Sequence, residues 1–305
     1  MSRFEDIEGF VQVVETGSFS QAATRLKLTK STLSRRVAHL EARLGVQLLN
    51  RTTRKISLTE AGGDLYKRCS IILADLEEAE SVAGAGQTKL SGTLRIAAPT
   101  SFGQMHLRPV IADFMRKHQH ITVDIDFNDR RVDIVEEGFD VAVRIGVLSD
   151  SSLIARKLVP IRSLVVGAPA FWDHYGRPKS PQDLRGLPAL RYSNIPRPEQ
   201  IPYWGSGGEQ GAVTAPIRLL ANDGQILAET AISGCGFVIE PSFLVHQQIK
   251  AGTLEAVLTE YEWLRSDLFV LYPPTRRLSA RVRAFVDTMV DHFANNAYWD
   301  EGLNL

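Results

Sequence analysis

Hydrophobic residues in the first sixty positions recur every three or four residues in three short segments, a spacing typical of amphipathic helices. We expect these helices at residues 4–15, 19–26 and 30–44. Ser18 and Thr29 can accept hydrogen bonds from the free amides that begin a helix, and Gly45 can end one. In the third segment the predicted buried stripe consists of Leu33, Val37, Leu40 and Leu44.

A tight turn between the second and third helices predicts a helix-turn-helix, whose last helix enters the DNA major groove with its N-terminal residues. Polar and basic residues occupy that position, on the side away from the buried stripe: Lys30, Ser31, Ser34 and Arg35. Residues 46–50 and 55–58 then alternate like two short strands, which predicts a wing. Its tip carries Arg51 and Arg54, which suit phosphate or minor-groove contact.

The distribution of charge changes this picture more than the total charge, which is zero. Nine Lys or Arg residues and one acid, Glu41, lie between Thr24 and Lys55, a local charge of +8. The other 26 basic and 34 acidic residues cancel it. A basic region on a mildly acidic body indicates a polyanionic partner for that region, although charge runs also occur on ordinary solvated helix faces.

A long segment without proline, from Thr59 to about Gln87, follows the wing. Its apolar residues step alternately by four and three: Leu65, Cys69, Ile72, Leu76, Ala79 and Ala83. Such a seam is typical of a two-stranded coiled coil. A helix of this length spans roughly 40 Å and is too long to bury its seam on so small a domain, so we expect it to pair with a second copy. The alternative is packing against the C-terminal half of its own chain.

Strands and helices alternate from Thr93 onward, which predicts an α/β fold with a largely parallel sheet. The expected strands are 93–98, 121–127, 139–145, 163–166, 217–221, 237–240 and 268–272. The expected helices are 103–118, 131–138, 169–175, 181–185, 223–233 and 279–293. The chain leaves one lobe near 161–163 and returns near 266–268, which predicts two lobes with a cleft at the carboxyl ends of the strands.

Polar residues at those strand ends are the candidate ligand contacts. Hydroxyls and helix-terminal amides around Ser101 can hold a carboxylate, and Arg144 is a suitable partner for an anion. The candidates are Thr100, Ser101, Phe102, Asn128, Arg144, Asn222 and Asp223, with Asp129 and Gly146 beside them. Each also has a structural alternative, a helix cap or turn for most of them and an ion pair for Arg144.

Other signals exclude several classes of protein. No apolar run is long enough for a membrane helix, the acidic start lacks the core of a signal peptide, and the two cysteines are too few for a disulfide framework. These features indicate the cytoplasm. The glycine-rich segment 205–211 misses the dinucleotide-binding spacing, and the histidines lack zinc-like spacing. We therefore expect no catalytic residue, no metal site and no cofactor. Cys69 is assigned to packing, and Cys235 lacks the partner cysteine of a thiol switch.

The N-terminal motifs resemble the DNA-binding domain of LysR-type transcriptional regulators. The similar segments are 17–23, 33–37, 40–41, 44–45, 48–51 and 58–62. The resemblance implies that Lys30, Ser31, Ser34 and Arg35 touch bases and phosphates and that Arg54 approaches the minor groove. Lys and Ser replace the commonest Gln and Pro of the family at positions 30 and 31, which alters the expected operator sequence rather than the binding mode.

The C-terminal half resembles the effector domain of the same family, in the branch usually called CrgA-like, through residues 139–146, 150–153, 234–237 and 250–254. The effector domain of that family is related to periplasmic solute-binding proteins. The implied fold is an α+β multidomain chain with a winged helix-turn-helix at 1–60, a linker or dimerisation helix and hinge at 61–90, and a two-lobed α/β effector domain at 91–305. Lobe I comprises 91–161 and 268–293, and lobe II comprises 162–267.

The implied function is a ligand-responsive regulator that binds promoter DNA as a dimer or tetramer and senses a small, anionic metabolite, such as a carboxylate, in the cleft. Dimerisation is expected through the linker helix, and no enzymatic activity is expected. The alternative from another class is a solute-binding protein or enzyme that has acquired an unrelated helical domain.

Overall fold

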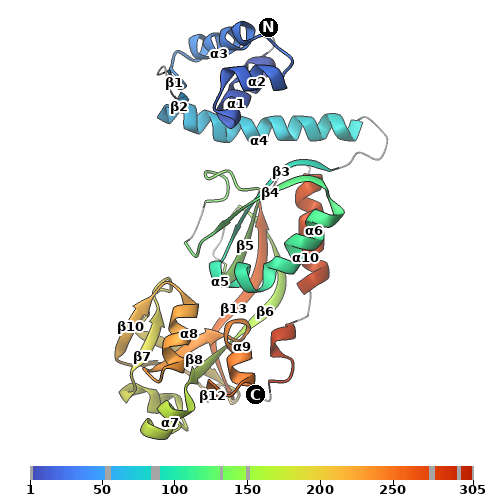
Figure 1. Cartoon of the computed structure of the whole chain (residues 1–305). Coiled ribbons are helices and arrows are strands. Elements are labelled where there is room, and N and C mark those ends of the chain that lie inside the picture. Colours follow the sequence, from blue (N-terminus) through green and yellow to red (C-terminus); the bar gives the residue numbers. More distant parts are fainter. Residues whose placement is uncertain are drawn as a thin grey trace. The chain divides into compact units, whose positions relative to one another are not determined.

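The computed structural model describes residues 3–51, 56–83, 90–130, 133–148, 152–274, 279–293 and 297–303. The chain divides into two compact units (Figure 1). Unit 1 comprises residues 1–92 with 135–138, and unit 2 comprises residues 93–134 with 139–305. None of the described helices is both long and apolar enough to cross a bilayer.

Unit 1 is built on three short helices, α1 (Arg3–Thr16), α2 (Phe19–Arg25) and α3 (Lys30–Leu44), as predicted. The Thr29 hydroxyl accepts a hydrogen bond from the Thr32 amide, and Gly45 ends α3 in the left-handed conformation. The buried stripe of α3 is confirmed for Leu33, Val37 and Leu40. It is wrong for Leu44, which is 43% exposed because the core of unit 1 reaches only as far as Leu40 on this helix.

The predicted wing is present as a two-stranded antiparallel ladder, β1 (Leu49–Arg51) and β2 (Ile56–Leu58). Its first strand begins later than predicted. The Val46 amide donates to the Glu41 carbonyl and the Leu48 amide to Oε1 of Glu41, so the segment before β1 is bonded to α3. The tip at 52–55, which includes the predicted contact Arg54, lies outside the described residues.

The long helix α4 (Glu60–Ala83) begins after Thr59, whose hydroxyl accepts a hydrogen bond from the Gly62 amide. Cys69 is 4% exposed in the core of unit 1, and Leu65, Tyr66 and Leu73 pack against the same core. The expectation that the whole seam needs a second copy is therefore wrong for its first half, because α4 covers the three-helix bundle along that half. Ile72 is 50% exposed.

Unit 2 is built on one mixed sheet, ordered β10-β7-β11-β6-β13-β5-β3-β4, with β8, β9 and β12 joined at its side. Its strands are β3 (Ser91–Ala98), β4 (His120–Phe127), β5 (Val141–Gly146), β6 (Ile154–Gly167), β7 (Ala189–Tyr192), β8 (Gln200–Gly205), β9 (Gln210–Thr214), β10 (Ile217–Ala221), β11 (Phe237–Pro241), β12 (Glu255–Val257) and β13 (Tyr261–Tyr272). Its helices are α5 (Thr100–Phe102), a π-helical turn (Gly103–Leu107), α6 (Arg108–Lys117), α7 (Pro169–Tyr175), a 3₁₀ turn (Pro181–Gly186), α8 (Gly224–Ile232), α9 (Ser242–Lys250), α10 (Ala280–Phe293) and a 3₁₀ turn (Tyr298–Asp300).

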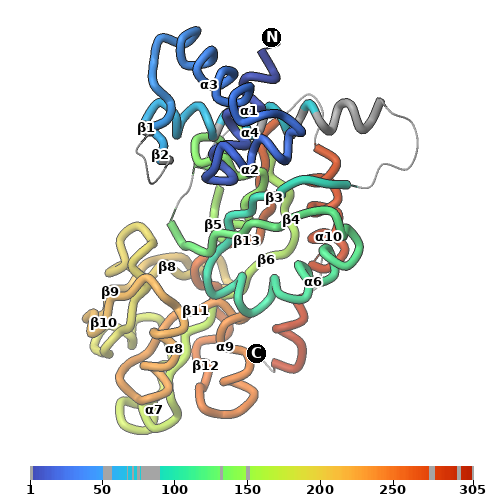
Figure 2. The backbone as a smooth tube through the Cα atoms, turned by 45° about the horizontal axis from the view of Figure 1, so that its top comes forward, coloured from blue at the N-terminus to red at the C-terminus, as the bar shows by residue number. Residues whose placement is uncertain are grey.

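The two lobes share their longest strands. β6 and β13 run antiparallel beside each other (Figure 2), with Ile161 opposite Ser266. In one lobe β13 pairs with β5, and in the other β6 pairs with β11 and β12. The predicted two-lobed α/β fold is confirmed. The expectation of a largely parallel sheet is wrong, because both strands that cross between the lobes run antiparallel to their neighbours.

Two local predictions also fail. Residues 134–138 of the expected helix 131–138 form turns, because Gly138 takes a positive φ and the Phe139 amide closes back onto the Ile134 carbonyl. The glycine-rich segment 205–211, for which the sequence indicated a proline-bearing loop, belongs to the β8–β9 hairpin, and the Gly205 amide donates to the Glu209 carbonyl across it.

We expect Gly62→Ala to destabilise unit 1 by about 1–3 kcal/mol, because the added Cβ would lie 2.0 Å from the carbonyl oxygen of Leu48. Gly63→Ala is the matched control. It meets nothing within 4 Å and should stabilise the helix by about 0.5–1 kcal/mol. Denaturant unfolding followed by far-UV circular dichroism measures both changes. Equal effects of the two variants would contradict the close approach of α4 to Leu48.

Candidate DNA interface and ligand site

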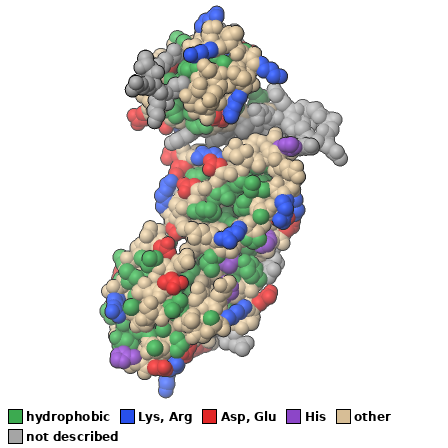
Figure 3. Space-filling model, in the orientation of Figure 1, with side chains coloured by type: hydrophobic (Ala, Val, Ile, Leu, Met, Phe, Trp, Pro, Cys, Tyr) green, Lys and Arg blue, Asp and Glu red, His purple; other side chains and the backbone are tan. Residues whose placement is uncertain are grey.

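The first turns of α3 present the predicted DNA contacts to solvent. Lys30, Ser31 and Arg35 are exposed and Ser34 is half-buried. On the opposite side of the helix Leu33 is fully buried. The amide groups at the start of a helix carry partial positive charge, which favours phosphate oxygens at this position. Lys and Arg side chains are spread over the visible surface of unit 1 (Figure 3).

Not every basic residue of α3 is available to DNA. A Glu5 carboxylate oxygen lies 3.0 Å from Nη2 of Arg36, whose side chain is only 13% exposed. The His39 ring contacts the buried Asp6 carboxylate over 2.7 Å. Arg36 and His39 therefore fasten α3 to α1, while the neighbouring Arg35 remains exposed. The basic run is therefore not simply a solvent-exposed helix face, because Arg36 forms an ion pair inside unit 1.

The wing contacts are less defined. Arg51 is the last residue of β1, where its backbone pairs with Ile56. Its side chain and the whole of Arg54 fall in the part of the chain that the structure leaves undescribed.

In unit 2 the chain becomes helical earlier than predicted, at α5 directly after β3, and the first amide of α5 already has a partner. The Thr100 N–H donates to Oδ1 of Asp129 over 3.0 Å, so the protein's own carboxylate occupies the position expected for a ligand carboxylate. Ser101 is half-buried beside it. Phe102 has no exposed surface, and its ring packs against Phe243 in an aromatic cluster. The predicted ligand contact at Phe102 is therefore corrected to a core position.

Two further candidates of this lobe differ in their surroundings. The side-chain nitrogen and oxygen of Asn128 are both buried and find no hydrogen-bond partner among the described residues. Nη1 of Arg144 instead donates to the Arg130 carbonyl over 2.7 Å, which ties this side chain to the backbone.

In the second lobe, Asn222 is exposed and Asp223 caps α8. Oδ1 of Asp223 accepts hydrogen bonds from the amides of Gln225 and Ile226 over 2.8 and 3.1 Å. The helix-cap alternative is thus confirmed for Asp223, although its carboxylate still contributes charge to this end of the sheet.

Sequence analysis missed Tyr192, at the end of β7. Burial raises the pKa of its hydroxyl, and the Asp129 carboxylate close to that hydroxyl raises it further. This proximity brings the end of β4 in one lobe to the end of β7 in the other. The strand 189–192 was not predicted, so its terminal tyrosine was not recognised as a strand-end residue.

Sequence analysis also missed Glu240, at the end of β11. Its side chain is 4% exposed, and burial raises the pKa of its carboxyl well above the ordinary range. The Arg191 guanidinium opposes this shift, and the Asp223 carboxylate adds to it. The sequence did carry a signal for this residue, because Glu240 is the charged residue in the otherwise apolar segment 237–241.

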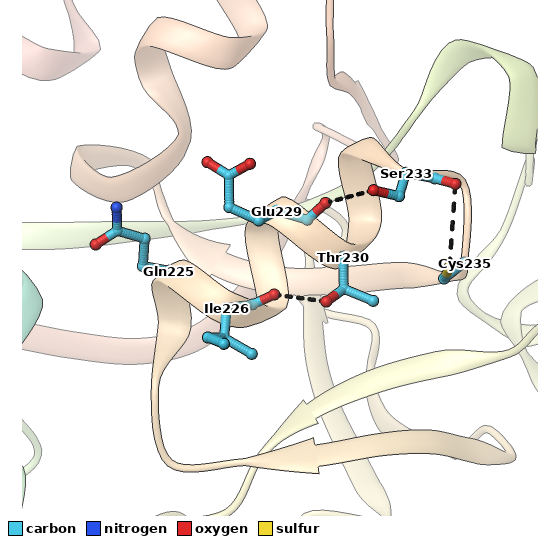
Figure 4. Close-up of a pocket in the computed structure, with 6 residues that line it drawn as sticks. All are labelled: Gln225, Ile226, Glu229, Thr230, Ser233 and Cys235. Carbon is cyan, nitrogen blue, oxygen red and sulfur yellow. Dashed lines mark hydrogen bonds between the residues drawn. The ribbon is translucent and has the colours of Figure 1, made fainter.

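A separate hollow of about 480 Å³ lies on the outer side of α8 (Figure 4). Its lining is Gln225, Ile226, Glu229, Thr230, Ser233 and Cys235. Cys235 is half-buried and forms no disulfide, and its thiol points to the Ser233 carbonyl at 4.0 Å. None of the strand-end candidates lines this hollow. The described residues contain no group of three or more His, Cys, Asp or Glu that could hold a metal ion.

Comparison with protein families matches both units. Residues 4–63 match the bacterial regulatory helix-turn-helix protein, lysR family, and residues 87–294 match the LysR substrate binding domain. The chain belongs to the LysR family of transcriptional regulators. It is therefore a DNA-binding regulator with an effector-binding domain, and the family resemblance seen in the sequence is confirmed.

Relatives of the regulator agree over nearly its whole length. It is 35% identical to an uncharacterized HTH-type transcriptional regulator of Haemophilus influenzae over 283 residues, covering 92% of this chain and 98% of that one. It is 34% identical to the HTH-type transcriptional regulator CrgA of Neisseria meningitidis serogroup B, covering 96% and 97% of the two chains.

Solved structures give the same result. The structure of CrgA from Neisseria meningitidis matches with a TM-score of 0.59 and 32% identity, over 95% of this chain and 99% of that one. The Vibrio cholerae virulence activator AphB matches with a TM-score of 0.57 and 27% identity, over 96% of this chain and 100% of that one.

The stability of unit 2 should depend on pH through a buried histidine in the π-helical turn after α5. His106 in this turn is 3% exposed, and its Nε2 contacts the Phe243 carbonyl. Burial lowers its pKa from 6.5 to about 4; His246 adds to this shift and the Phe243 carbonyl opposes it. Between these pH values the unfolded chain binds the proton and the folded chain does not, so acidification from pH 6.5 to 4 should remove up to about 3 kcal/mol of stability from unit 2.

Tryptophan fluorescence reports this change, because all four tryptophans lie in unit 2. His106→Gln should lose less stability than the wild type over that pH range, while the exposed His174→Gln should follow the wild type. Parallel pH curves for His106→Gln and the wild type would contradict the assignment.

Proposed function

We propose that this regulator reads promoter DNA with the first turns of α3 and responds to a small molecule at the strand ends of unit 2. The observation that carries the proposal is the exposure of Lys30 and Arg35 on the side of α3 opposite Leu33, within a domain that matches the family's helix-turn-helix. The relatives are transcriptional regulators, which does not favour the alternative of an enzyme or a solute-binding protein. We infer that it acts in the cytoplasm.

The proposed base and phosphate contacts are Lys30, Ser31, Ser34 and Arg35, with Arg51 and Arg54 of the wing at the adjacent backbone or minor groove. A Lys at position 30 favours the acceptors of guanine or a phosphate. The Ser31 hydroxyl already lies 3.0 Å from Oγ1 of Thr29, so the first turn of α3 offers an ordered hydroxyl pair rather than two independent side chains.

The regulator is proposed to bind as a homodimer through α4, which supplies two copies of α3 for two half-sites. Ile72 supports this, because a half-exposed Ile on a long helix is available to a second copy. A tetramer needs a second self-contact. Exposed apolar residues on the edge strand β10 and on α8 offer one: Ile217, Leu220 and Ile226. Hydrophobic atoms are visible on that part of unit 2 (Figure 3).

The proposed effector contacts are Ser101 and Asn128 from lobe I (91–161 and 268–293) and Asn222 and Asp223 from lobe II (162–267). The unpartnered amide of Asn128 supports a ligand at this place. A carboxylate ligand is less well supported. The Thr100 amide already donates its hydrogen bond to Asp129, and Nη1 of Arg144 donates to a backbone carbonyl.

Arg35→Ala should weaken binding to operator DNA by about 1–3 kcal/mol, or 5- to 150-fold, because it removes an exposed groove contact. Gel shifts at two salt concentrations measure the loss and the salt slope. Arg36→Ala is the matched control. It breaks the Glu5 ion pair and should lower stability with a smaller loss of affinity. A larger affinity loss for Arg36→Ala than for Arg35→Ala would contradict the groove assignment.

Ile72→Glu should weaken self-association by about tenfold or more, because it puts a charge into the proposed helix contact. Sedimentation equilibrium of the full chain measures this change. Arg68→Glu introduces the same residue at an exposed position of the same helix and should associate like the wild type. If the two variants behaved alike, α4 would not be the dimer contact.

A further inference from the structure

Glu240 carries a buried carboxyl group on β11. Its residue is 4% exposed, and its Oε1 is fully buried and unpartnered among the described residues. Its Oε2 lies 3.0 Å from the position that a Cβ on Gly224 would take, at the start of α8. A buried acid left in this way costs free energy, so its presence requires an explanation beyond packing.

A structural ion pair with Arg191 does not supply that explanation. The positive charge of Arg191 lowers the pKa of the Glu240 carboxyl. The Arg191 side chain itself bonds elsewhere: its Nε donates to the Pro198 carbonyl over 2.7 Å and its Nη2 to the Gln200 carbonyl over 3.4 Å. Burial lowers the pKa of Arg191 to about 10. The described residues hold no ion pair between the two side chains, so Arg191 neutralises the site only at a distance.

Among the described residues, the other charged group that acts on Glu240 is an acid: Asp223 caps α8 and raises the pKa of the Glu240 carboxyl. The Tyr192 hydroxyl on β7 is under the influence of both Asp129 and Glu240. Asp129 follows β4, beside the unpartnered amide of Asn128. The carboxyl groups of Asp129, Asp223 and Glu240 thus act on this region from three strand ends, and their charge disfavours a further anion.

We propose that this strand-end site binds the ammonium group of an amine effector, with the Glu240 carboxylate as its counter-ion. An ammonium brings three hydrogen-bond donors and a positive charge, which match a buried acceptor in an acidic surrounding. The proposal rests on the proposed effector role of these strand ends and replaces the anionic ligand expected from the sequence. Burial favours the neutral form of the Glu240 carboxyl and an ammonium partner favours its carboxylate, so formation of the ion pair should release a proton to the buffer.

Four probes of matched length test the ligand class on the full chain: 1,4-diaminobutane, 4-aminobutan-1-ol, butane-1,4-diol and succinate. Isothermal titration calorimetry in two buffers of different ionisation enthalpy gives affinity and proton release together. We expect the two amines to bind with proton release, and the diol and succinate to bind at least tenfold more weakly. Glu240→Gln should weaken amine binding at least tenfold. Glu229→Gln, which removes an exposed carboxylate from α8, should bind the amines like the wild type.

Succinate or the diol binding as tightly as the amines, no binding of either amine, or unchanged amine binding by Glu240→Gln would each overturn the proposal. Amine binding without proton release would overturn the assignment to Glu240. These failures are distinguishable from failure of the proposed function, because gel shifts of the same preparations report operator binding independently. Intact DNA binding with any of these results removes only the ligand class, whereas absent DNA binding removes the regulator function itself.

Discussion

Burial of one apolar stripe on α3 determines which side of this helix faces solvent. Leu33 and Val37 are fully buried in the same core as Phe10 and Val13 of α1, and a helix that buries one side must present the other. Arg35 is exposed for this reason. The same core holds Cys69 and the first half of α4, so the helix that is proposed to pair two chains also supports the helix that is proposed to enter the groove.

Unit 2 depends on a different constraint, the continuity of β6 and β13 through both lobes. Because these strands are shared, the carboxyl ends of β4 and β7 meet, and Asp129 comes close to Tyr192. Two acids then occupy the same region. Asp129 accepts a hydrogen bond from the Thr100 amide, whereas Oε1 of Glu240 has no partner among the described residues. Such a region favours a ligand that donates hydrogen bonds over one that accepts them.

Local pattern was sufficient wherever a local cause shapes the structure. The caps at Thr29 and Gly45 and the helix 169–175 depend on neighbouring residues, and the sequence located all three. Residues whose surroundings come from distant segments were harder. Phe102 resembled a loop residue but packs against Trp299 from the C-terminal turn, and Arg36 looked like Arg35 until its pairing with Glu5 was known.

The proposed ligand site shows the same division. Its proposed location at strand ends followed from the alternating elements, whereas the burial of Tyr192 and Glu240 there did not, because both residues belong to short strands whose neighbours in the sheet are remote in sequence. The antiparallel course of β6 and β13 was missed for the same reason: hydrophobic alternation specifies a strand but not the direction of its partner.

One carboxylate oxygen of Glu41 accepts the amides of both Leu48 and Leu49, which joins the middle of α3 to the first strand of the wing. The proposed groove and backbone contacts therefore lie on two elements that one side chain joins. To exchange DNA specificity between two relatives, positions 29–58 would have to be replaced together. A replacement helix without Glu41 would lose the hydrogen bonds that hold the first wing strand against it.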